Sequence, residues 1–176
     1  MQTLTCPIPS NLNPLSPNGF QFGITKIPEV SFFCQEVSIP EVSLPMATQS
    51  TPLSDSRVPG DKLEFGELTI QFLIDEDMGN YLALHNWIMG LGFPKDHNQY
   101  TKWLRDHALL ETSELQQGYS DGNLIILNSN NTPNKTIKFV DLFPTSLASI
   151  QFQSTISEIN YLVGTASFGY TYYEFE

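Results

Sequence analysis

The chain has 176 residues, a length that suits one domain built around a single hydrophobic core. Its 19 acidic residues against 8 basic ones give a net charge of −11, which argues against a nucleic-acid-binding surface and against docking on anionic membranes. No apolar run is as long as a membrane-spanning helix and no basic-then-apolar leader opens the chain, so we expect no membrane partner. Only 15% of the residues are charged and 12% are aromatic, a composition that favours burial of surface against other copies of the chain.

Residues 1–18 form a proline-rich arm that we separate from the domain of residues 19–176. Prolines at positions 7, 9, 14 and 17 leave no room for a regular element, so this segment is predicted to be extended. Two interpretations stay open: a floppy terminus, or an arm that orders against a neighbouring subunit. The second gains support from the apolar residues along it, Leu4, Ile8, Leu12 and Leu15.

Three strands are predicted between residues 19 and 45. The first alternates cleanly, with Phe20, Phe22 and Ile24 on one face. The apolar phase of the second slips from one face to the other, which a bulge or burial on both faces would explain. The third is flanked by prolines, which permit only an edge strand. The elements are a strand at 19–25, a turn at 26–29, a strand at 30–39 and an edge strand at 41–44.

Residues 46–62 are the longest segment without an inward-facing pattern. Loops of this length in compact domains are usually functional or disordered. The alternation of Thr48, Ser50 and Pro52 has no core face, so a hairpin formed here would project outward.

A strand and a helix at the centre of the chain are predicted to form the nucleus of the core. Residues 67–74 alternate with period two, and residues 81–91 repeat their apolar side chains at spacings of three and four. The triplet Asp75-Glu76-Asp77 lies between them, where it can cap the helix and complement its dipole. Gly90 and Gly92 are expected to end the helix, with Pro94 beyond them.

The remaining elements complete an antiparallel sheet. Residues 95–117 are polar and are predicted to be a surface insertion with a short helix near Trp103. The strands that follow are expected at 122–128, at 135–142 up to a break at 143–145, at 148–153, and at 161–175. The predicted class is α+β: seven or eight predominantly antiparallel strands and one principal helix, arranged as a sandwich or partly closed barrel.

The sequence contains no recognised catalytic pattern, so we expect no enzyme. There is no nucleophile elbow and no phosphate-cradling glycine pattern, although paired carboxylates of a glycosidase remain an alternative. Cys6 and Cys34 are interpreted as free thiols, with a disulfide as the alternative.

No cofactor and no metal are expected either. Capping explains the acidic triplet, whose spacing does not match a calcium loop. His85 is interpreted as a packed imidazole on the helix, while His97 and His107 lie in polar surroundings. Tyrosines 170, 172 and 173 could stack sugars, which leaves a carbohydrate-binding module as an alternative of another class.

Three stretches resemble the tail tube proteins of contractile-tailed bacteriophages. The first joins Pro59-Gly60-Asp61 to the strand at 67–72, the acidic triplet, and the helix residues Asn80, Tyr81 and Trp87. The second is the segment 139–147, with its Leu-aromatic-Pro-Thr break, and the third is the closing aromatic strand that ends at Phe175. Together they cover most of residues 19–176.

The resemblance implies a structural virion protein. Subunits of this family form hexameric rings that stack into a tube inside a contractile sheath, and DNA and the tape measure protein pass through the lumen. It implies the partners as well: further copies of the chain, the tail sheath protein and the baseplate tube proteins. The protein would be a part of the virion, assembled in the host cytoplasm.

Residue roles follow from the same resemblance. The loop at 46–62 sits where the family reaches the adjacent ring, which assigns ring stacking to Thr48, Ser50, Leu53 and Arg57. The candidate lumen-facing residues are Glu67, Thr69, Gln71, Ser149, Gln151 and Gln153. A baseplate tube-initiating protein and a tube subunit of a bacterial injection system are the alternatives within the same machinery.

Overall fold

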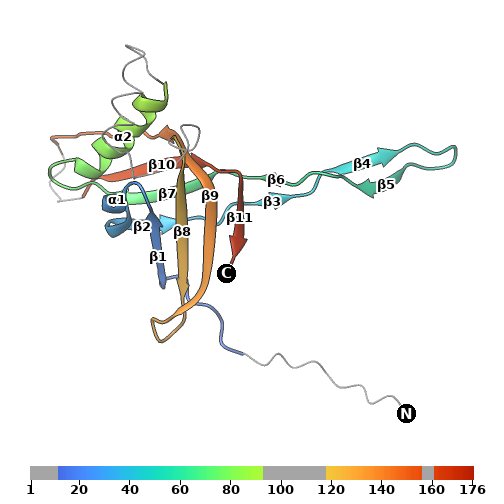
Figure 1. Cartoon of the computed structure of the whole chain (residues 1–176), viewed down its shortest axis with the longest axis horizontal. Helices are drawn as coiled ribbons and strands as arrows, with labels where there is room; N and C mark the ends of the chain where they lie inside the picture. The colour runs from blue at the N-terminus through green and yellow to red at the C-terminus, as the bar shows by residue number, and fades with distance from the viewer. Residues whose placement is uncertain (1–11, 93–117, 156–160) are drawn as a thin grey trace.

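The computed structural model describes residues 12–92, 118–155 and 161–176 (Figure 1). These residues form eleven strands and two helices, and every strand pairing among them is antiparallel. The predicted α+β class is confirmed, although within the described residues the strands do not close into a barrel. The helices are α1 (Pro28–Phe32) and α2 (Gly79–Gly92), and neither is long and apolar enough to cross a membrane.

Seven strands form one sheet. Six of them follow the order β1-β8-β9-β10-β7-β2, and β11 pairs with the part of β9 that also pairs with β8, on the margin opposite β8. Two short ladders, β3 with β6 and β4 with β5, extend away from it (Figure 1). The strands are β1 (Phe20–Ile24), β2 (Cys34–Val37), β3 (Val42–Ser43), β4 (Met46–Gln49), β5 (Ser56–Pro59), β6 (Glu64–Phe65), β7 (Leu68–Leu73), β8 (Ser120–Leu127), β9 (Pro133–Leu147), β10 (Val163–Gly169) and β11 (Tyr172–Phe175).

Strand β9 connects two halves of the sheet. Its first part pairs with β8 and β11, and its last part pairs with β10. Between these parts Asp141 adopts a positive φ of 57°, and the Thr171 hydroxyl lies 3.1 Å from its carboxylate. Because β9 continues through residues 143–145 to Leu147, the prediction that these residues break the strand was wrong. Pro144 lies at a register shift opposite Phe168, where a strand tolerates a residue without an N–H.

The predicted strand at 30–39 was also wrong in its first half. Pro28 opens a short helix, because its fixed φ and missing N–H suit the first helical turn. Ile27 and Val30 are buried from this turn, and β2 begins only at Cys34. The slip in apolar phase thus marks a change from helix to strand.

The C-terminal predictions need two corrections. Residues 148–153 form no strand. Only Ala148 continues the pairing, since its N–H donates to Thr165 O at 2.8 Å. The single strand expected at 161–175 is divided into β10 and β11 at Tyr170 and Thr171. Two different parts of β9 pair with these pieces, so the division follows from the bend in β9.

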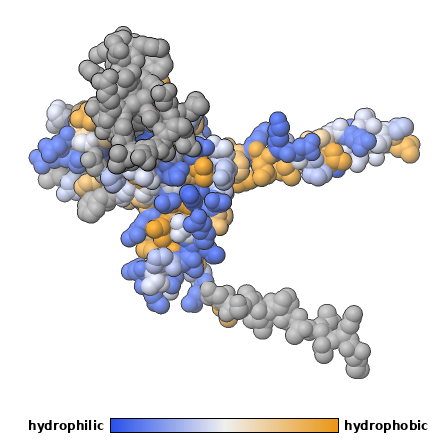
Figure 2. Space-filling model, in the orientation of Figure 1, coloured by the Kyte–Doolittle hydropathy of each residue, from blue (hydrophilic) through white to orange (hydrophobic). Residues whose placement is uncertain are grey.

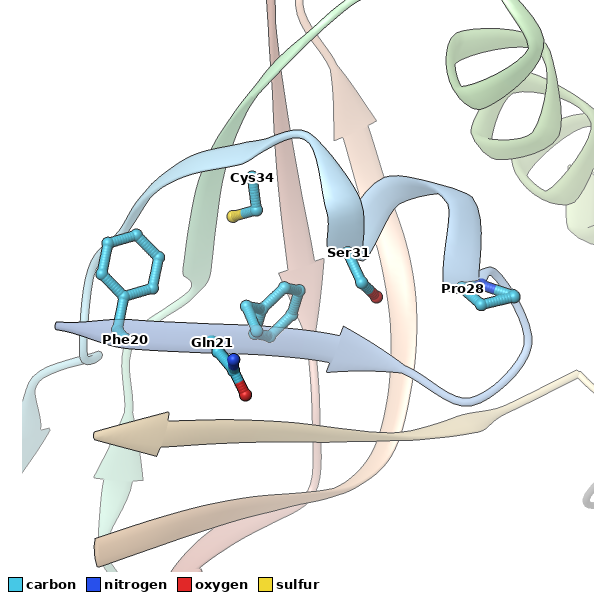
Figure 3. Close-up of a pocket in the computed structure, with 6 residues that line it drawn as sticks. Phe20, Gln21, Pro28, Ser31 and Cys34 are labelled. Atoms are coloured by element: carbon cyan, nitrogen blue, oxygen red, sulfur yellow. The ribbon is translucent and has the colours of Figure 1, made fainter. Parts of the chain in front are cut away.

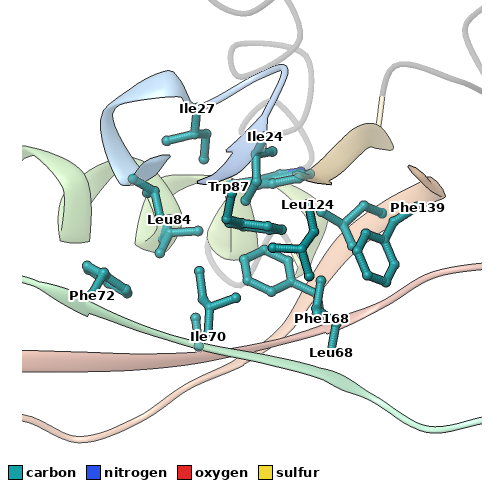
Figure 4. Close-up of a cluster of buried hydrophobic side chains, with 14 of the residues drawn as sticks. Ile24, Ile27, Leu68, Ile70, Phe72, Leu84, Trp87, Leu124, Phe139 and Phe168 are labelled. Carbon is teal, nitrogen blue, oxygen red and sulfur yellow. The ribbon is translucent and has the colours of Figure 1, made fainter. Parts of the chain in front are cut away.

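Helix α2 lies over one face of β7 and β10 and closes the core (Figures 1 and 4). Trp87 is fully buried at its centre, with Nε1–H donating to Gly118 O at 3.1 Å and its ring 6.3 Å from that of Phe168. Leu84 lies one turn earlier and is also fully buried. The buried apolar side chains are Phe22, Ile24, Ile27, Val30, Leu68, Ile70, Phe72, Leu84, Trp87, Leu124, Ile137, Phe139, Leu142, Ala166 and Phe168.

The prediction that the acidic triplet caps α2 was wrong, because the helix begins only at Gly79. Asn80 connects strand and helix instead. Its buried amide donates to Leu73 O at 2.7 Å, and its Oδ1 accepts from the N–H of Tyr81 at 2.8 Å. Helix α2 is described as far as Gly92, where the described residues stop, and residues 95–117, with His97 and His107, lie outside them. His85 is exposed on α2, so its assignment as a packed imidazole was wrong.

We expect Trp87→Ala to lower the free energy of unfolding by about 3–5 kcal/mol, because it removes a fully buried indole and leaves a cavity. Urea denaturation followed by circular dichroism measures the change. The matched control on the same helix is His85→Ala, whose exposed side chain should change stability by less than about 0.5 kcal/mol. Equal effects of the two substitutions would contradict the described core.

Candidate assembly surfaces

A two-stranded arm, residues 39–66, projects from the body of the protein (Figure 1). Its outer part is the hairpin of β4 and β5, so the outward-projecting hairpin expected within residues 46–62 is present. Thr48 and Arg57 face each other across this hairpin. Ser50 and Leu53 lie in the turn at its tip, where Leu53 is 99% exposed.

The arm begins where the β2–β7 ladder of the body ends. Ser38 N–H donates to Thr69 O at the end of the β2–β7 pairing, at 3.1 Å. Three residues further along each strand, in the same register, Gly66 N–H donates to Glu41 O at 2.8 Å, and Val42 lies opposite Phe65. The direction of the arm therefore begins in the sheet itself.

A register shift divides the arm into a root, β3 with β6, and the outer hairpin. Two residues on one strand, 44–45, lie between the ladders opposite four on the other, 60–63. Gly60 N–H donates to Pro45 O at 2.7 Å, and a Cβ on Gly60 would lie 2.4 Å from that oxygen. Only glycine permits this close approach of the two backbones.

Apolar side chains are exposed along the arm from root to tip (Figure 2). Exposed apolar surface of this extent usually marks an interaction site. The side chains are Ile39, Val42, Leu44, Met46, Leu53, Val58 and Leu63.

The second surface is the face of β10, β7 and their neighbours that lies opposite the core. Residues alternate on β7 between buried Leu68, Ile70 and Phe72 and half-buried Thr69 and Gln71. Strand β10 alternates in the same way. Residues directly opposite in an antiparallel pair share a face, so the pairings bring one set of polar side chains together. This polar sheet face consists of Glu36, Ser38, Thr69, Gln71, Ser146, Thr165 and Ser167.

The polar sheet face contains no basic residue and one carboxylate, that of Glu36. Of the predicted lumen residues, Thr69 and Gln71 lie on it, and Glu67 is exposed just before β7. Ser149, Gln151 and Gln153 lie in the irregular segment after β9 and do not join the ladder. Sequence reasoning missed Thr165 and Ser167, although the alternation Gly-Thr-Ala-Ser-Phe on β10 carries the signal.

Strands β2, β7, β10 and the end of β9 form a four-stranded unit, and no described strand pairs with either of its outer margins. The pairings of Glu36 with Gln71 and of Ser38 with Thr69 direct the N–H and C=O groups of Val37, which lies between them, away from β7. At the other margin, Ser146 and Ala148 pair with β10, so the backbone of Leu147 points away from it. Such open margins are templates for pairing with another chain.

A groove of about 460 Å³ lies between β1 and the α1–β2 segment (Figure 3). Phe20, Gln21, Pro28, Ser31 and Cys34 line it, and Ser31 Oγ accepts from Ile24 N–H at 3.3 Å. Burial raises the pKa of the Cys34 thiol to about 11, so the thiol is protonated and a poor nucleophile at neutral pH. Cys34 is a free thiol in the structure, and Cys6 lies outside the described residues.

The described part of the chain contains no cluster of three His, Cys, Asp or Glu side chains that could hold a metal ion. Tyr170 and Tyr173 pack into an aromatic cluster, while Tyr172 is exposed on β11.

A family is assigned from nearly the whole chain. The sequence model of the family described as "Phage tail tube protein" matches residues 6–176. The chain belongs to the phage tail tube protein family. It is a structural protein of phage tails and not an enzyme.

This tail tube protein resembles both tube and terminator proteins. The tail tube terminator protein of Enterobacteria phage T4 is 24% identical to it over 146 residues, which make up 81% of this chain and 76% of that protein. The anti-feeding prophage tube-terminating cap shares its fold with a TM-score of 0.60 at 14% identity, covering 99% of both chains. A chain of the sheath–tube complex of an extracellular contractile injection system gives 0.59 at 14% identity, covering 94% and 93%.

Proposed function

We propose that this tail tube protein forms hexameric rings in the tail of a contractile phage, with the polar sheet face lining the channel. The observation that carries the proposal is the four-stranded unit of β2, β7, β10 and the end of β9, which has one polar face and two open margins. In a ring, β2 of one copy pairs with the end of β9 of the next copy. This satisfies the backbone groups of both margins and leaves no exposed edge.

The channel wall would then repel DNA without holding it. The polar sheet face carries hydroxyl and amide groups, one carboxylate and no cation, and the whole chain has a net charge of −11. Phosphates bind proteins through Lys and Arg, so a wall without them allows DNA and the tape measure protein to slide.

The arm would make the contact between this ring and its neighbour along the tail. Thr48, Ser50, Leu53 and Arg57 lie on its outer hairpin, and the apolar side chains exposed along the arm would become buried there. Association on this scale derives mainly from apolar burial, with the polar tip residues setting the register.

We place the ring at the end of the tube, as a terminator, in preference to the repeated tube subunit expected from the sequence. The relation to the phage T4 terminator supports this position, as does the 99% coverage of the tube-terminating cap. The partners are further copies of the chain, the tube proteins and the tail sheath, in a virion part assembled in the host cytoplasm. The repeated subunit stays the second candidate because a chain of the sheath–tube complex gives almost the same TM-score as the cap. A baseplate tube protein is a further alternative, and like a terminator it would be present as a single ring.

Electron microscopy of the purified protein is expected to show closed rings with a central hole. Quantitative mass spectrometry of virions then separates the two positions, because a terminator is present as one hexamer and a tube subunit as many stacked ones. A protein that remains monomeric at high concentration and does not bind purified tail tubes would contradict the proposed ring.

The proposed channel wall is tested by Gln71→Lys, which adds a cation to the polar sheet face. In phage that carry it, DNA ejection at low salt should slow on the order of tenfold, and the defect should shrink as salt screens the phosphate contacts. Gln151→Lys makes the same chemical change in the irregular segment and is expected to leave ejection unchanged. If only Gln151→Lys slows ejection, the other candidate face lines the channel.

A further inference from the structure

The root of the arm lies against a cluster of aromatic rings from the C-terminal end of the chain. The ring of Phe65, on β6, meets Tyr170 edge-on at a centroid distance of 6.1 Å and Tyr173 at 5.7 Å. Phe139 on β9 completes the group, 5.3 Å from Tyr170 and 5.7 Å from Tyr173. We call Phe65, Phe139, Tyr170 and Tyr173 the aromatic clamp.

Tyr173 contacts both strands of the arm. Its ring packs on Phe65 of the returning strand, and its hydroxyl donates to Pro40 O of the outgoing strand at 3.3 Å. Pro40 is buried although the arm beyond it is exposed. Strand β11, which carries Tyr173, is held in turn by pairing with β9.

The arm needs such a support because its own root is weak. The β3–β6 ladder contains two residue pairs, and Pro40 interrupts the pairing between it and the body because proline has no N–H. A two-stranded ribbon alone is at best marginally stable in water. The tertiary contacts of the clamp therefore decide how firmly the arm keeps its direction.

We propose that Phe65 and Tyr173 are positioning residues that hold the arm at a fixed direction to the sheet, so that the C-terminal strand sets where the arm meets its target. The clamp itself follows from contacts within one chain. That its target is a neighbouring ring rests on the proposed function.

Tyr170 provides a matched control inside the same cluster. Its hydroxyl is buried and has no hydrogen-bond partner among the described residues. Burial, with a smaller contribution from Tyr173, raises the pKa of Tyr170 to about 12, so the phenol stays neutral. Tyr170→Phe and Tyr173→Phe delete the same atom, but only the second removes a hydrogen bond to the arm.

The direction of the arm is measured by pulsed electron–electron double resonance, which gives the distance distribution between two spin labels on the full chain. Leu53→Cys places one label at the tip, and Asn123→Cys places the other on the exposed face of β8. Cys6→Ser and Cys34→Ser remove the native thiols. The labelled parent is expected to give one narrow distance distribution.

Tyr173→Phe and Phe65→Leu should each widen that distribution about twofold, since the root loses its support and relies on a marginal ladder. Tyr170→Phe should leave it unchanged. Circular dichroism confirms that each variant is folded, and Tyr173→Phe keeps its ring, so the hydroxyl deletion stays informative even if Phe65→Leu unfolds. Equal widths for Tyr173→Phe, Tyr170→Phe and the parent would overturn the clamp.

Binding of the same variants to purified tail tubes then tests the target. The proposal expects Tyr173→Phe to bind several-fold more weakly than Tyr170→Phe. Tyr173→Phe could widen the distance distribution while the parent protein neither binds tubes nor forms rings. In that case the clamp is supported and the proposed function is wrong. If the parent binds and the Tyr173→Phe variant binds equally well, the coupling of clamp to target is wrong.

Discussion

Backbone hydrogen bonding at the margins of the polar four-stranded unit is the constraint on which the rest of the structure depends. A strand with one neighbour leaves half of its N–H and C=O groups without a partner from the sheet. The groups of Val37 on one margin and Leu147 on the other are in this position. In the proposed ring, one repeated contact between identical copies would satisfy these groups on both margins.

The remaining elements hold that unit in shape. Trp87 and the core residues below α2 fix one face of β7 and β10, which leaves the other face for polar side chains. The bend of β9 at Asp141 connects this unit to the β1–β8 half of the sheet. The arm leaves the body at the end of the same β2–β7 ladder, so in the proposed assembly the contacts along the tail and around the ring would both involve β2 and β7.

Local patterns predicted much of this fold. The period-two alternation of β7, the helix containing Trp87 and the hairpin of β8 and β9 follow from periodicity and turn residues alone. The errors lie where tertiary context overrides the pattern: Pro28 opens a helix, Pro144 stays in a strand at a register shift, and Asn80 replaces the acidic triplet at the start of α2.

The polar sheet face could be predicted only in part. The alternation of β7 identified Thr69 and Gln71, but Ser146 and Thr165 join them through a strand order that the sequence does not contain. The aromatic clamp could not be predicted from the sequence either, because Phe65 and Tyr173 are distant in the chain and the pairing of β11 with β9 brings them together. Long-range pairing decides both surfaces.

Hydrogen exchange of the free chain and of the assembled tail tests the ring most directly. The ring account predicts that the amides of Val37 and Leu147 exchange readily in the free chain and become protected on assembly. The amide of Ala166, inside the sheet, should be protected in both states, and that of Ser129 in the β8–β9 turn in neither. Rapid exchange at Val37 and Leu147 in the assembled tail would contradict the closure of these margins by neighbouring copies.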